Sequence, residues 1–378
     1  MYDLIVVGGG IAGLYMADKY LEKYPNARIC VLEKSARLGG RIKTIRDNGS
    51  THYEAGASRI NKRHLRVLKL VKSLGLNLIE IGRASNTEVQ SKIISVIKVV
   101  KKMPRLEAIK LTFGDACDQV FGKQEKERIR GLFGYNSVFD DMNAYDSIHM
   151  FKNSFNKEPY FVIKEGYDAV ITRLRDKLKH LANIYTDCDV VSISDSSVVT
   201  TKDGRMFKGG LVVCAVPRAS LLKLFPEAEE KLDSVAPVAL NRMYGFVDPT
   251  WLSQCPVTTT RDHIRQFIPI NPDTGLAMVT YSDTHDAMYW HKNHTLTNLN
   301  AHLKSLFERN APVARGIRNY FWAAGSHVWR PGVSSTQMKK QVMFLKRNVV
   351  VVGEAYSGDQ GWVEGALSTV DNAIRVIG

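Results

Sequence analysis

Three glycines and one glutamate near the amino terminus have the residue types and the spacing of a nucleotide-binding site. Gly8, Gly10 and Gly13 follow a short apolar run, and Glu33 comes twenty residues after Gly13. Gly8 allows a tight turn, Gly10 lets the backbone approach a pyrophosphate, and Gly13 lets a helix pack closely on a strand. The carboxylate of Glu33 can accept hydrogen bonds from ribose hydroxyls. The pattern predicts that this segment binds an adenine dinucleotide.

Hydrophobic periodicity predicts the elements that position these glycines. Residues 2–7 form a β-branched run that suits a buried parallel strand, and residues 11–24 have a helical period closed by Pro25. The glycines then lie where a strand turns into a helix, whose free N–H groups face the phosphates. This strand–turn–helix unit is typical of a Rossmann-like α/β domain.

Further motifs lie downstream and at the far carboxyl end. Residues 38–41 read Leu-Gly-Gly-Arg and residues 54–60 read Glu-Ala-Gly-Ala-Ser-Arg-Ile. An apolar run at 348–352 precedes Gly-Glu-Ala at 353–355, and Gln-Gly-Trp-Val-Glu-Gly-Ala at 360–366 opens a last helix. Together with the glycine motif, these segments bracket the chain and resemble the flavin-containing amine oxidase superfamily. That superfamily contains monoamine and polyamine oxidases, and L-amino acid oxidases and histone demethylases are related enzymes.

The resemblance implies that the chain binds FAD rather than NAD. Arg41 would lie beside the pyrophosphate, residues 56–59 along the flavin, and Glu354 near the ribityl chain or the pyrophosphate. Val190 would touch the adenine. No cysteine occurs in residues 320–347, where some family members attach their flavin, so FAD is expected to be non-covalent. The full set of residues expected to contact FAD is Gly8, Gly10, Ile11, Ala12, Gly13, Glu33, Lys34, Gly40, Arg41, Gly56, Ala57, Ser58, Arg59, Val190, Gly353, Glu354, Trp362, Val363 and Ala366.

Oxidation of an amine by a flavin depends mainly on the shape of the site. A neutral amine must be held with its α-carbon near flavin N5. In the family two aromatic walls often do this, and Trp362 matches one of them. The other wall is expected within residues 319–329, where Trp322, His327 and Trp329 are candidates that the sequence does not rank. The alternative is that these rings only pack in the core, as most aromatic side chains do.

One position departs from the family pattern. Many members place a lysine, bridged by water to flavin N5, on the strand that corresponds to residues 238–246, and this chain has Asn241 and Arg242 there. A guanidinium stays charged and binds planar anions in a fork, so it does not replace an ammonium group. Arg242 is therefore a candidate partner for a substrate carboxylate, or alternatively one half of a structural ion pair.

Composition sets outer limits on the class of protein. The chain has 378 residues, of which 44% are hydrophobic and 24% charged, as in ordinary soluble proteins. No apolar run reaches the roughly 18 residues of a membrane span, and a strand that starts at residue 2 leaves no room for a signal peptide. Five scattered cysteines suit a reducing compartment. We therefore expect a cytoplasmic protein without a membrane partner.

The formal net charge of +14 is high for such a chain. It would repel polyamines at long range and attract anions. A nucleic acid or an acidic protein is one possible partner, but the basic stretches lack the interleaved aromatics of a single-strand binding surface. A lysine-rich solvated surface is the favoured explanation.

Three histidines close in sequence, His285, His291 and His294, raise the question of a metal. Their spacing matches no standard ligand pattern, so no metal site is expected.

The family pattern implies an α/β fold with two interleaved domains. A discontinuous Rossmann-like FAD-binding domain would comprise residues 1–82, 158–235 and 338–378. An α+β substrate-binding domain would comprise residues 83–157, expected to be helical, and 236–337, expected to alternate strands and turns.

The leading hypothesis is an FAD-dependent oxidoreductase that oxidises a primary or secondary amine to an imine, with oxygen then giving hydrogen peroxide. Its partners would be a small-molecule amine and oxygen. A related FAD-dependent dehydrogenase or desaturase and an L-amino acid oxidase are enzymatic alternatives. A third alternative is a non-catalytic FAD-binding protein whose basic surface contacts a partner.

Overall fold

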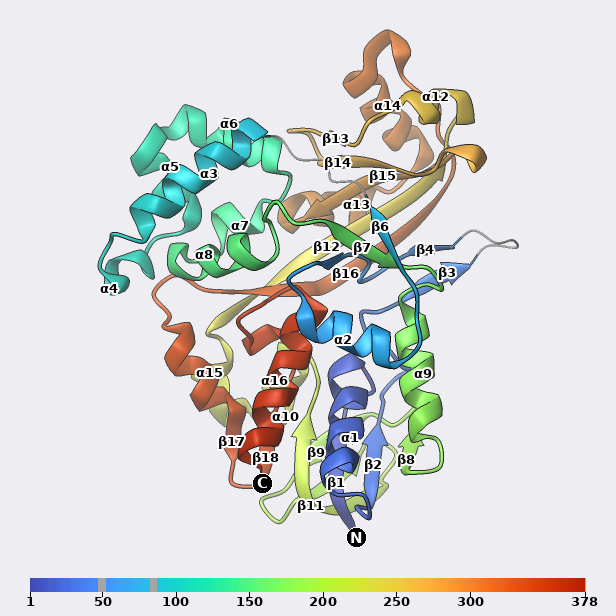
Figure 1. Cartoon of the computed structure of the whole chain (residues 1–378), viewed down its shortest axis with the longest axis vertical. Helices are drawn as coiled ribbons and strands as arrows, with labels where there is room; N and C mark the ends of the chain where they lie inside the picture. Colours follow the sequence, from blue (N-terminus) through green and yellow to red (C-terminus); the bar gives the residue numbers. More distant parts are fainter. Residues whose placement is uncertain (47–51, 82–86, 378) are drawn as a thin grey trace.

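The computed structural model of the chain describes residues 1–46, 52–81 and 87–377. In Figure 1 its lower half is built on an eight-stranded sheet, and its upper half on a five-stranded antiparallel sheet with a group of helices beside it. Both termini lie at the lower end. The predicted domain limit between residues 82 and 83 falls outside the described residues.

The eight-stranded sheet has a parallel centre, as a Rossmann-like fold requires. Strands β18, β11, β1, β2 and β8 pair in parallel in that order, β17 closes one edge antiparallel, and the hairpin β9–β10 extends β11. The strands are β17 (Phe344–Lys346), β18 (Val349–Val351), β11 (Met206–Cys214), β1 (Tyr2–Val7), β2 (Ile29–Leu32), β8 (Ala182–Tyr185), β9 (Val190–Ile193) and β10 (Val198–Thr201).

Strand β1 is buried on both faces because its side chains alternate between two hydrophobic cores. Leu4 and Val6 pack in the cluster that includes side chains of α1, α9 and α16, whereas Ile5 and Val7 pack in the cluster that includes α10. The predicted strand at 2–7 is confirmed, and the predicted helix after it ends at Lys23. The helices of this half are α1 (Ile11–Lys23), α2 (Leu65–Ser73), α9 (Asp168–Leu178), α10 (Arg218–Leu224), η1 (Pro226–Ala228), α11 (Glu229–Leu232), α15 (Ser335–Met343), η4 (Glu354–Tyr356) and α16 (Val363–Val376).

Two long strands, β12 and β16, connect the two halves. Their antiparallel ladder begins beside the core of the eight-stranded sheet, where Val235 pairs with Trp329, and continues to Phe246 in the upper sheet. The upper sheet has the order β13 (Thr258–Thr259), β14 (Gln266–Asn271), β15 (Leu276–Asp283), β12 (Val235–Phe246) and β16 (Arg315–Trp329). Strand β12 therefore crosses the predicted domain limit at 235 and 236, and these limits stay a prediction.

The helices expected between residues 83 and 157 are present on one side of the upper sheet (Figure 1). Two small sheets, β5–β7–β6 and β3–β4, lie at middle height in Figure 1, with β3–β4 on the side away from these helices. These elements are α3 (Thr87–Val100), α4 (Arg105–Ala108), α5 (Phe113–Phe121), α6 (Lys123–Phe133), α7 (Ser137–Asp140), α8 (Ala144–Asn153), β3 (Thr44–Arg46), β4 (His52–Glu54), β5 (Ile60–Asn61), β6 (Leu78–Ile81) and β7 (Tyr160–Ile163).

The expectation of strands and turns throughout residues 236–337 is wrong at several places, where helices occur. Three helices, α12 (Pro249–Gln254), α13 (Thr284–Asn293) and α14 (Leu296–Phe307), and the short turns η2 (Pro272–Thr274) and η3 (Glu308–Asn310), lie there. In α14, Leu299 and Leu303 are buried four residues apart, which is helical spacing. The polar residues between them hid this period.

No helix within residues 1–46, 52–81 and 87–377 is both long enough and apolar enough to cross a membrane.

We expect Gly13→Ala to destabilise the fold. A Cβ atom at position 13 would lie 1.9 Å from the carbonyl oxygen of Gly8, so β1 and α1 would have to move apart. Such overpacking costs about 1–3 kcal/mol or more. Denaturant unfolding of the cofactor-free protein measures the effect, with Gly210→Ala as control because its added Cβ meets only Asp3 O, at 3.4 Å. Equal stability of the two variants would contradict this account of the turn.

Candidate active site

The glycine motif forms an open turn at the carboxyl end of β1. Gly8 has a φ of 107°, a conformation that favours glycine. Gly10 caps the amino end of α1, where no side chain fills the capping role, and no atom lies within 4 Å of the position that a Cβ on Gly10 would take. Free helical N–H groups beside open space are what a pyrophosphate needs, so the motif fits the predicted dinucleotide.

Glu33 lies beside this turn, at the end of β2. Its Oε2 accepts a hydrogen bond from the backbone N of Gly9 at 2.7 Å, and its Oε1 accepts two from Ser35. The carbonyl of Glu33 accepts from Cys188 N, two residues before Val190, and Lys34 pairs with Asp189 at 3.1 Å. The structure therefore brings Glu33, Lys34 and Val190 together, and their contacts with an adenosine stay predictions.

A buried carboxylate, Glu354, joins three of the predicted segments. Its side chain accepts hydrogen bonds from Arg41, from Nδ1 of His327 at 2.7 Å and from the backbone N of Gly361 at 2.9 Å. Burial acts to raise the pKa of this carboxyl, but the charge of Arg41 and the hydrogen bonds from His327 and Gly361 outweigh burial and hold the pKa well below its usual range. Glu354 is therefore ionised at neutral pH.

The state of Glu354 determines what His327 can do. A carboxylate only accepts, so Nδ1 of His327 carries the proton in this hydrogen bond. The ring is fully buried, and its other nitrogen, Nε2, has no hydrogen-bond partner. In a neutral imidazole Nε2 is an acceptor, and buried acceptors are rarely left unpaired. Nε2 of His327 is thus a buried polar atom without a hydrogen-bond partner among the described residues.

Glu54 and Ala55, which directly precede the predicted flavin segment 56–59, are hydrogen-bonded to the long strands β12 and β16. The carbonyl of Glu54 accepts from Nη1 of Arg242 at 2.9 Å and from the hydroxyl of Tyr244 at 2.7 Å. The carbonyl of Ala55 accepts from the indole N–H of Trp322 at 2.7 Å. The position of this segment is therefore set by residues 188 to 267 positions away in the sequence.

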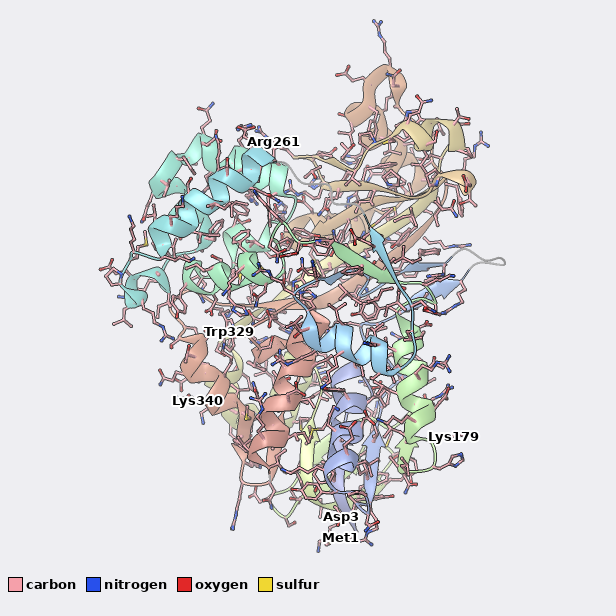
Figure 2. The ribbon with its side chains drawn as sticks, in the orientation of Figure 1. Met1, Asp3, Lys179, Arg261, Trp329 and Lys340 are labelled. Carbon is pink, nitrogen blue, oxygen red and sulfur yellow. The ribbon has the colours of Figure 1, made fainter. Side chains whose placement is uncertain are left out.

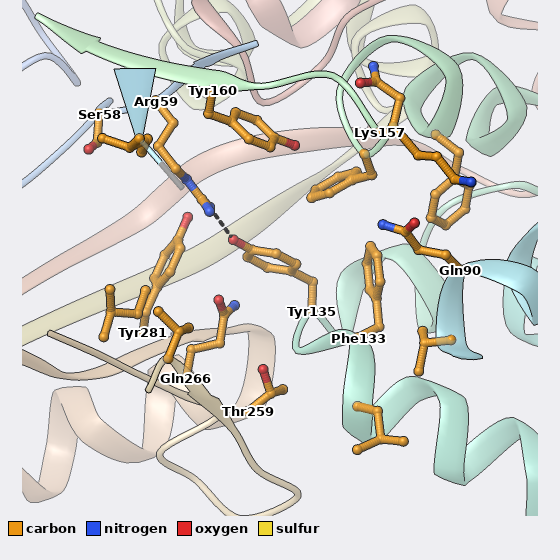
Figure 3. Close-up of a pocket in the computed structure, with 18 of the residues that line it drawn as sticks. Ser58, Arg59, Gln90, Phe133, Tyr135, Lys157, Tyr160, Thr259, Gln266 and Tyr281 are labelled. Carbon is orange, nitrogen blue, oxygen red and sulfur yellow. Dashed lines mark hydrogen bonds between the residues drawn. The ribbon is translucent and has the colours of Figure 1, made fainter. Parts of the chain in front are cut away.

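Two adjoining cavities open next to these segments. The larger has a volume of about 1620 Å³ and is shown in Figure 3, and the smaller has about 110 Å³. The smaller is lined by His327, Trp362 and Val363, among others. The residues that line both cavities, and so mark the boundary between them, are Ser58, Arg59, Tyr135, Phe155, Arg242 and Tyr281.

Two arginines lie at this boundary. Nη2 of Arg59 donates to the hydroxyl of Tyr135 at 2.7 Å, as Figure 3 shows, and its guanidinium carbon lies 5.6 Å from the centre of the Tyr160 ring. The guanidinium carbon of Arg242 lies 4.7 Å from the centre of the Tyr281 ring. Burial acts to raise the pKa of the Tyr281 phenol, but the charges of Arg242 and Arg59 outweigh burial and lower that pKa. The two cations thus set the electrostatics of this boundary.

The five residues predicted to carry the chemistry divide into two groups. His327, Trp362 and Arg242 line the cavities, whereas Trp322 and Trp329 line neither of the two. Trp329 is 1% exposed and lies where the two halves meet (Figure 2), with its indole N–H donating to Ser357 O at 3.0 Å. The geometry therefore directs attention to the first three, whose roles stay predictions.

Sequence reasoning missed several aromatic residues of the cavity. Tyr135 and Tyr281 hold the arginines, and His64 packs edge-on against Trp362 with ring centres 4.8 Å apart. Burial lowers the pKa of His64 to about 4, so this ring is neutral at pH 7. Tyr135 follows a phenylalanine-rich connection, and Tyr281 lies in an ordinary apolar strand. Neither position has a local signal that separates a cavity residue from a core residue.

The three neighbouring histidines do not converge. His285 faces Asp286, His291 stacks on Phe321, and His294 bonds to backbone carbonyls. No group of three or more histidine, cysteine or acidic side chains suited to a metal occurs in the described parts of the chain.

Comparisons with known proteins point to one family. The model of a family described as flavin containing amine oxidoreductase matches residues 111–373, and that of an NAD(P)-binding Rossmann-like domain matches residues 6–74. An uncharacterized protein, R188 of Acanthamoeba polyphaga mimivirus, is 21% identical over 98% of this chain and 93% of its own length.

Other relatives match only in part or only in fold. Flavin-containing amine oxidase A of Equus caballus is 35% identical, and amine oxidase B of Homo sapiens 37% identical; the matches cover 22% and 21% of this chain and 15% of each relative. A solved putrescine oxidase variant with redesigned cofactor binding has a TM-score of 0.80 at 14% identity, covering 100% of this chain and 98% of that one. The last likeness shows the fold.

We expect Glu354→Gln to lower the free energy of unfolding at pH 7 by roughly 1.5–3 kcal/mol, the range for hydrogen bonds to a charged group. The pKa of Glu354 in the folded protein is lower than in the unfolded chain, where it is about 4.3. Its contribution is therefore present above that pH and is lost as the pH falls toward the folded pKa. The difference between wild type and variant should shrink on acidification below pH of about 5.

Denaturant unfolding of both proteins at several acidic pH values measures this difference. Glu80→Gln is the matched control, because Glu80 is exposed on β6. A difference that stays constant with pH would show that the Glu354 charge does not stabilise the fold.

Proposed function

This chain belongs to the family of flavin-containing amine oxidoreductases, and we propose that it uses non-covalent FAD to oxidise a primary or secondary amine to an imine. One observation carries the proposal: the smaller cavity, walled by Trp362 and His327, is lined by residues of two segments predicted to contact FAD, 57–59 and 362–363, and shares lining residues with a large, partly apolar cavity. A cofactor and an organic substrate could therefore meet at Trp362.

Several residues would hold the cofactor. The amino end of α1 would bind the pyrophosphate, Glu33 the ribose, and the Arg41–Glu354 pair would lie near the ribityl chain. None of the five cysteines lines either cavity, which supports a non-covalent flavin. When bound, the flavin would accept a hydride equivalent at N5 and pass it to oxygen, giving hydrogen peroxide.

The protein's own part in the reaction would be to bind the amine in its unprotonated form and to exclude water from it. Nε2 of His327, held by Glu354 through Nδ1, offers a buried acceptor for a substrate N–H. Trp362 packs between His64, Phe155 and Tyr160, so its ring is fixed as one wall. Aromatic rings that exclude water favour the uncharged amine, which is the form that can release a hydride.

We expect an anaerobic absorbance titration of the purified holoprotein to reveal substrate. The panel would include spermidine, benzylamine and several L-amino acids. Loss of the oxidised flavin band with a substrate, and its return when air is admitted, would support an oxidase that uses oxygen. Loss of the band without recovery in air would indicate a dehydrogenase with another acceptor. A band that no amine bleaches would contradict the proposal.

We expect Gly10→Ala to weaken the binding of FAD without lowering the stability of the cofactor-free fold. A Cβ at this position meets no protein atom within 4 Å, and the backbone φ of −75° suits alanine, so the cofactor-free fold should keep its Tm within a few degrees. The added methyl group would block the close approach of the pyrophosphate. Titration of the cofactor-free protein with FAD should give a Kd at least tenfold higher than that of wild type. Unchanged affinity would place the dinucleotide elsewhere.

A further inference from the structure

The two arginines at the cavity boundary have no acidic partner. Their hydrogen bonds go to the Tyr135 hydroxyl and to the Glu54 carbonyl, and their planes lie against tyrosine rings. Among the described residues, no carboxylate oxygen lies within 4.0 Å of a guanidinium nitrogen of Arg59 or Arg242, which is the distance limit for an ion pair. Arg242 is only 8% exposed. The structural ion pair considered for Arg242 is therefore not formed.

Such an arrangement is costly without a negative ligand. Buried charges in folded proteins are normally paired, because removal of an ion from water is expensive. Burial and, to a lesser extent, the charge of Arg59 act to lower the pKa of Arg242, but the neighbouring phenols of Tyr281 and Tyr244 outweigh them and raise that pKa, so Arg242 keeps its charge. A guanidinium binds carboxylate and phosphate groups through a planar fork. The boundary thus has the charge and the donors of an anion site.

The two acidic side chains that line the cavities in the described chain, Glu54 and Asp283, form no ion pair with these arginines. The carboxylate of Asp283 accepts from the backbone N–H groups of Asn136 and Ser137. Glu54 is the one acidic residue among those that line the larger cavity in the described chain. Its carboxylate oxygens accept from the hydroxyl of Thr44 and from the backbone N of Tyr167. Burial, only partly offset by these hydrogen bonds, raises the pKa of Glu54 to about 7, so much of it is protonated at neutral pH.

The outer part of the same cavity is also cationic. Lys98, Lys101, Lys152 and Lys157 line it and are exposed, and none of the four forms an ion pair within the described chain. In Figure 3, Lys157 lies on the side of the cavity opposite Arg59. Exposed charges of one sign around an opening raise the local concentration of ligands of the opposite sign.

The rest of the cavity wall is apolar. Helix α3 contributes Ile93 and Ile97, α8 contributes Phe151, and β14 contributes Ile268 and Ile270. Burial of hydrocarbon against such a wall is favourable by about 25 cal/mol per Å² of apolar area. A ligand that suits the whole cavity therefore has both an anionic group and an apolar part.

We propose that the substrate is an apolar amine that also carries a carboxylate or phosphate group, that Arg59 and Arg242 bind this group, and that the four lysines attract it. That the substrate carries an amino group rests on the proposed function. That it carries an anionic group rests on the arrangement of charges in the cavity. Polyamines, with several positive charges and no anionic group, are poor ligands of this cavity.

Binding of matched probes without turnover tests the anion site. Hexanoate, hexyl phosphate and hexylamine have the same chain length and differ in their charged end. Each is titrated by isothermal calorimetry under anaerobic conditions into the holoprotein with its flavin reduced, so that hexylamine cannot be oxidised. We expect hexanoate or hexyl phosphate to bind at least tenfold more tightly than hexylamine, and the preference between these two identifies the anionic group. Equal or tighter binding of hexylamine would overturn the proposal.

Variants assign the binding to the arginines. Arg242→Gln and Arg59→Gln should each weaken binding of the preferred anion at least tenfold, and Arg242→Lys should weaken it less. Arg309→Gln, an exposed arginine on η3, is the matched control and should have no effect. If Arg242→Gln changes the flavin spectrum or FAD affinity but not the anion affinity, the arginines serve the cofactor and the proposal is wrong.

The lysines are tested by kinetics. Lys98→Gln combined with Lys101→Gln should slow association of the preferred anion several-fold at low salt and little at high salt. Lys179→Gln, at an exposed position on the lower right of the molecule in Figure 2, is the control. An unchanged association rate of the double variant at low salt would overturn the part of the proposal that concerns the lysines.

These outcomes separate this inference from the proposed function. If hexanoate or hexyl phosphate binds through the arginines but no amine reduces the flavin, the anion site stands and amine oxidation fails. If hexylamine reduces the flavin while neither anion binds, amine oxidation stands and the anion site fails. A preference in kcat/KM for 6-aminohexanoate or L-leucine over hexylamine would support both.

Discussion

The site depends on one buried carboxylate. Glu354 follows β18 and holds Arg41 from the amino-terminal motif, His327 from β16 and the backbone of Gly361 before α16. Because these partners are far apart in sequence, the carboxylate fixes the relative positions of segments that the chain brings together only on folding. A charge in a water-poor setting needs all of its partners. The Leu-Gly-Gly-Arg segment at residues 38–41 and the wall of the smaller cavity are thereby coupled through a single side chain.

The ribbon of β12 and β16 has a similar role for the other half. Its residues contribute to the cores of both halves, and alternation along β12 places Arg242 and Tyr244 on one face, where both donate to the carbonyl of Glu54. A shift of register by one residue would turn both away. Packing of this ribbon therefore decides where the segment expected to line the flavin lies, and also where the positive charge of Arg242 lies.

The sequence alone was sufficient for the local elements but not for the cavity. The glycine spacing and apolar run predict β1 and α1, because turn geometry and burial are local demands. The sequence could not show whether Arg242 forms an ion pair or keeps a free guanidinium. The answer depends on which side chains β15 and the segment before β5 place next to Arg242. For the same reason Arg59 was expected only along the flavin, and its contact with Tyr135 was not foreseen.

The position of the charges is more informative than their sum. A net charge of +14 spread over a surface is screened within about 8 Å at physiological salt, so it says little about a ligand in a cavity. The lysines at the opening are subject to that screening and can act only on the rate of encounter. The guanidinium groups of Arg59 and Arg242 lie deeper, where screening is weaker, so they would act on affinity. The exposed lysines would therefore speed the arrival of anions without discriminating among them, whereas the two arginines would determine which anion binds tightly.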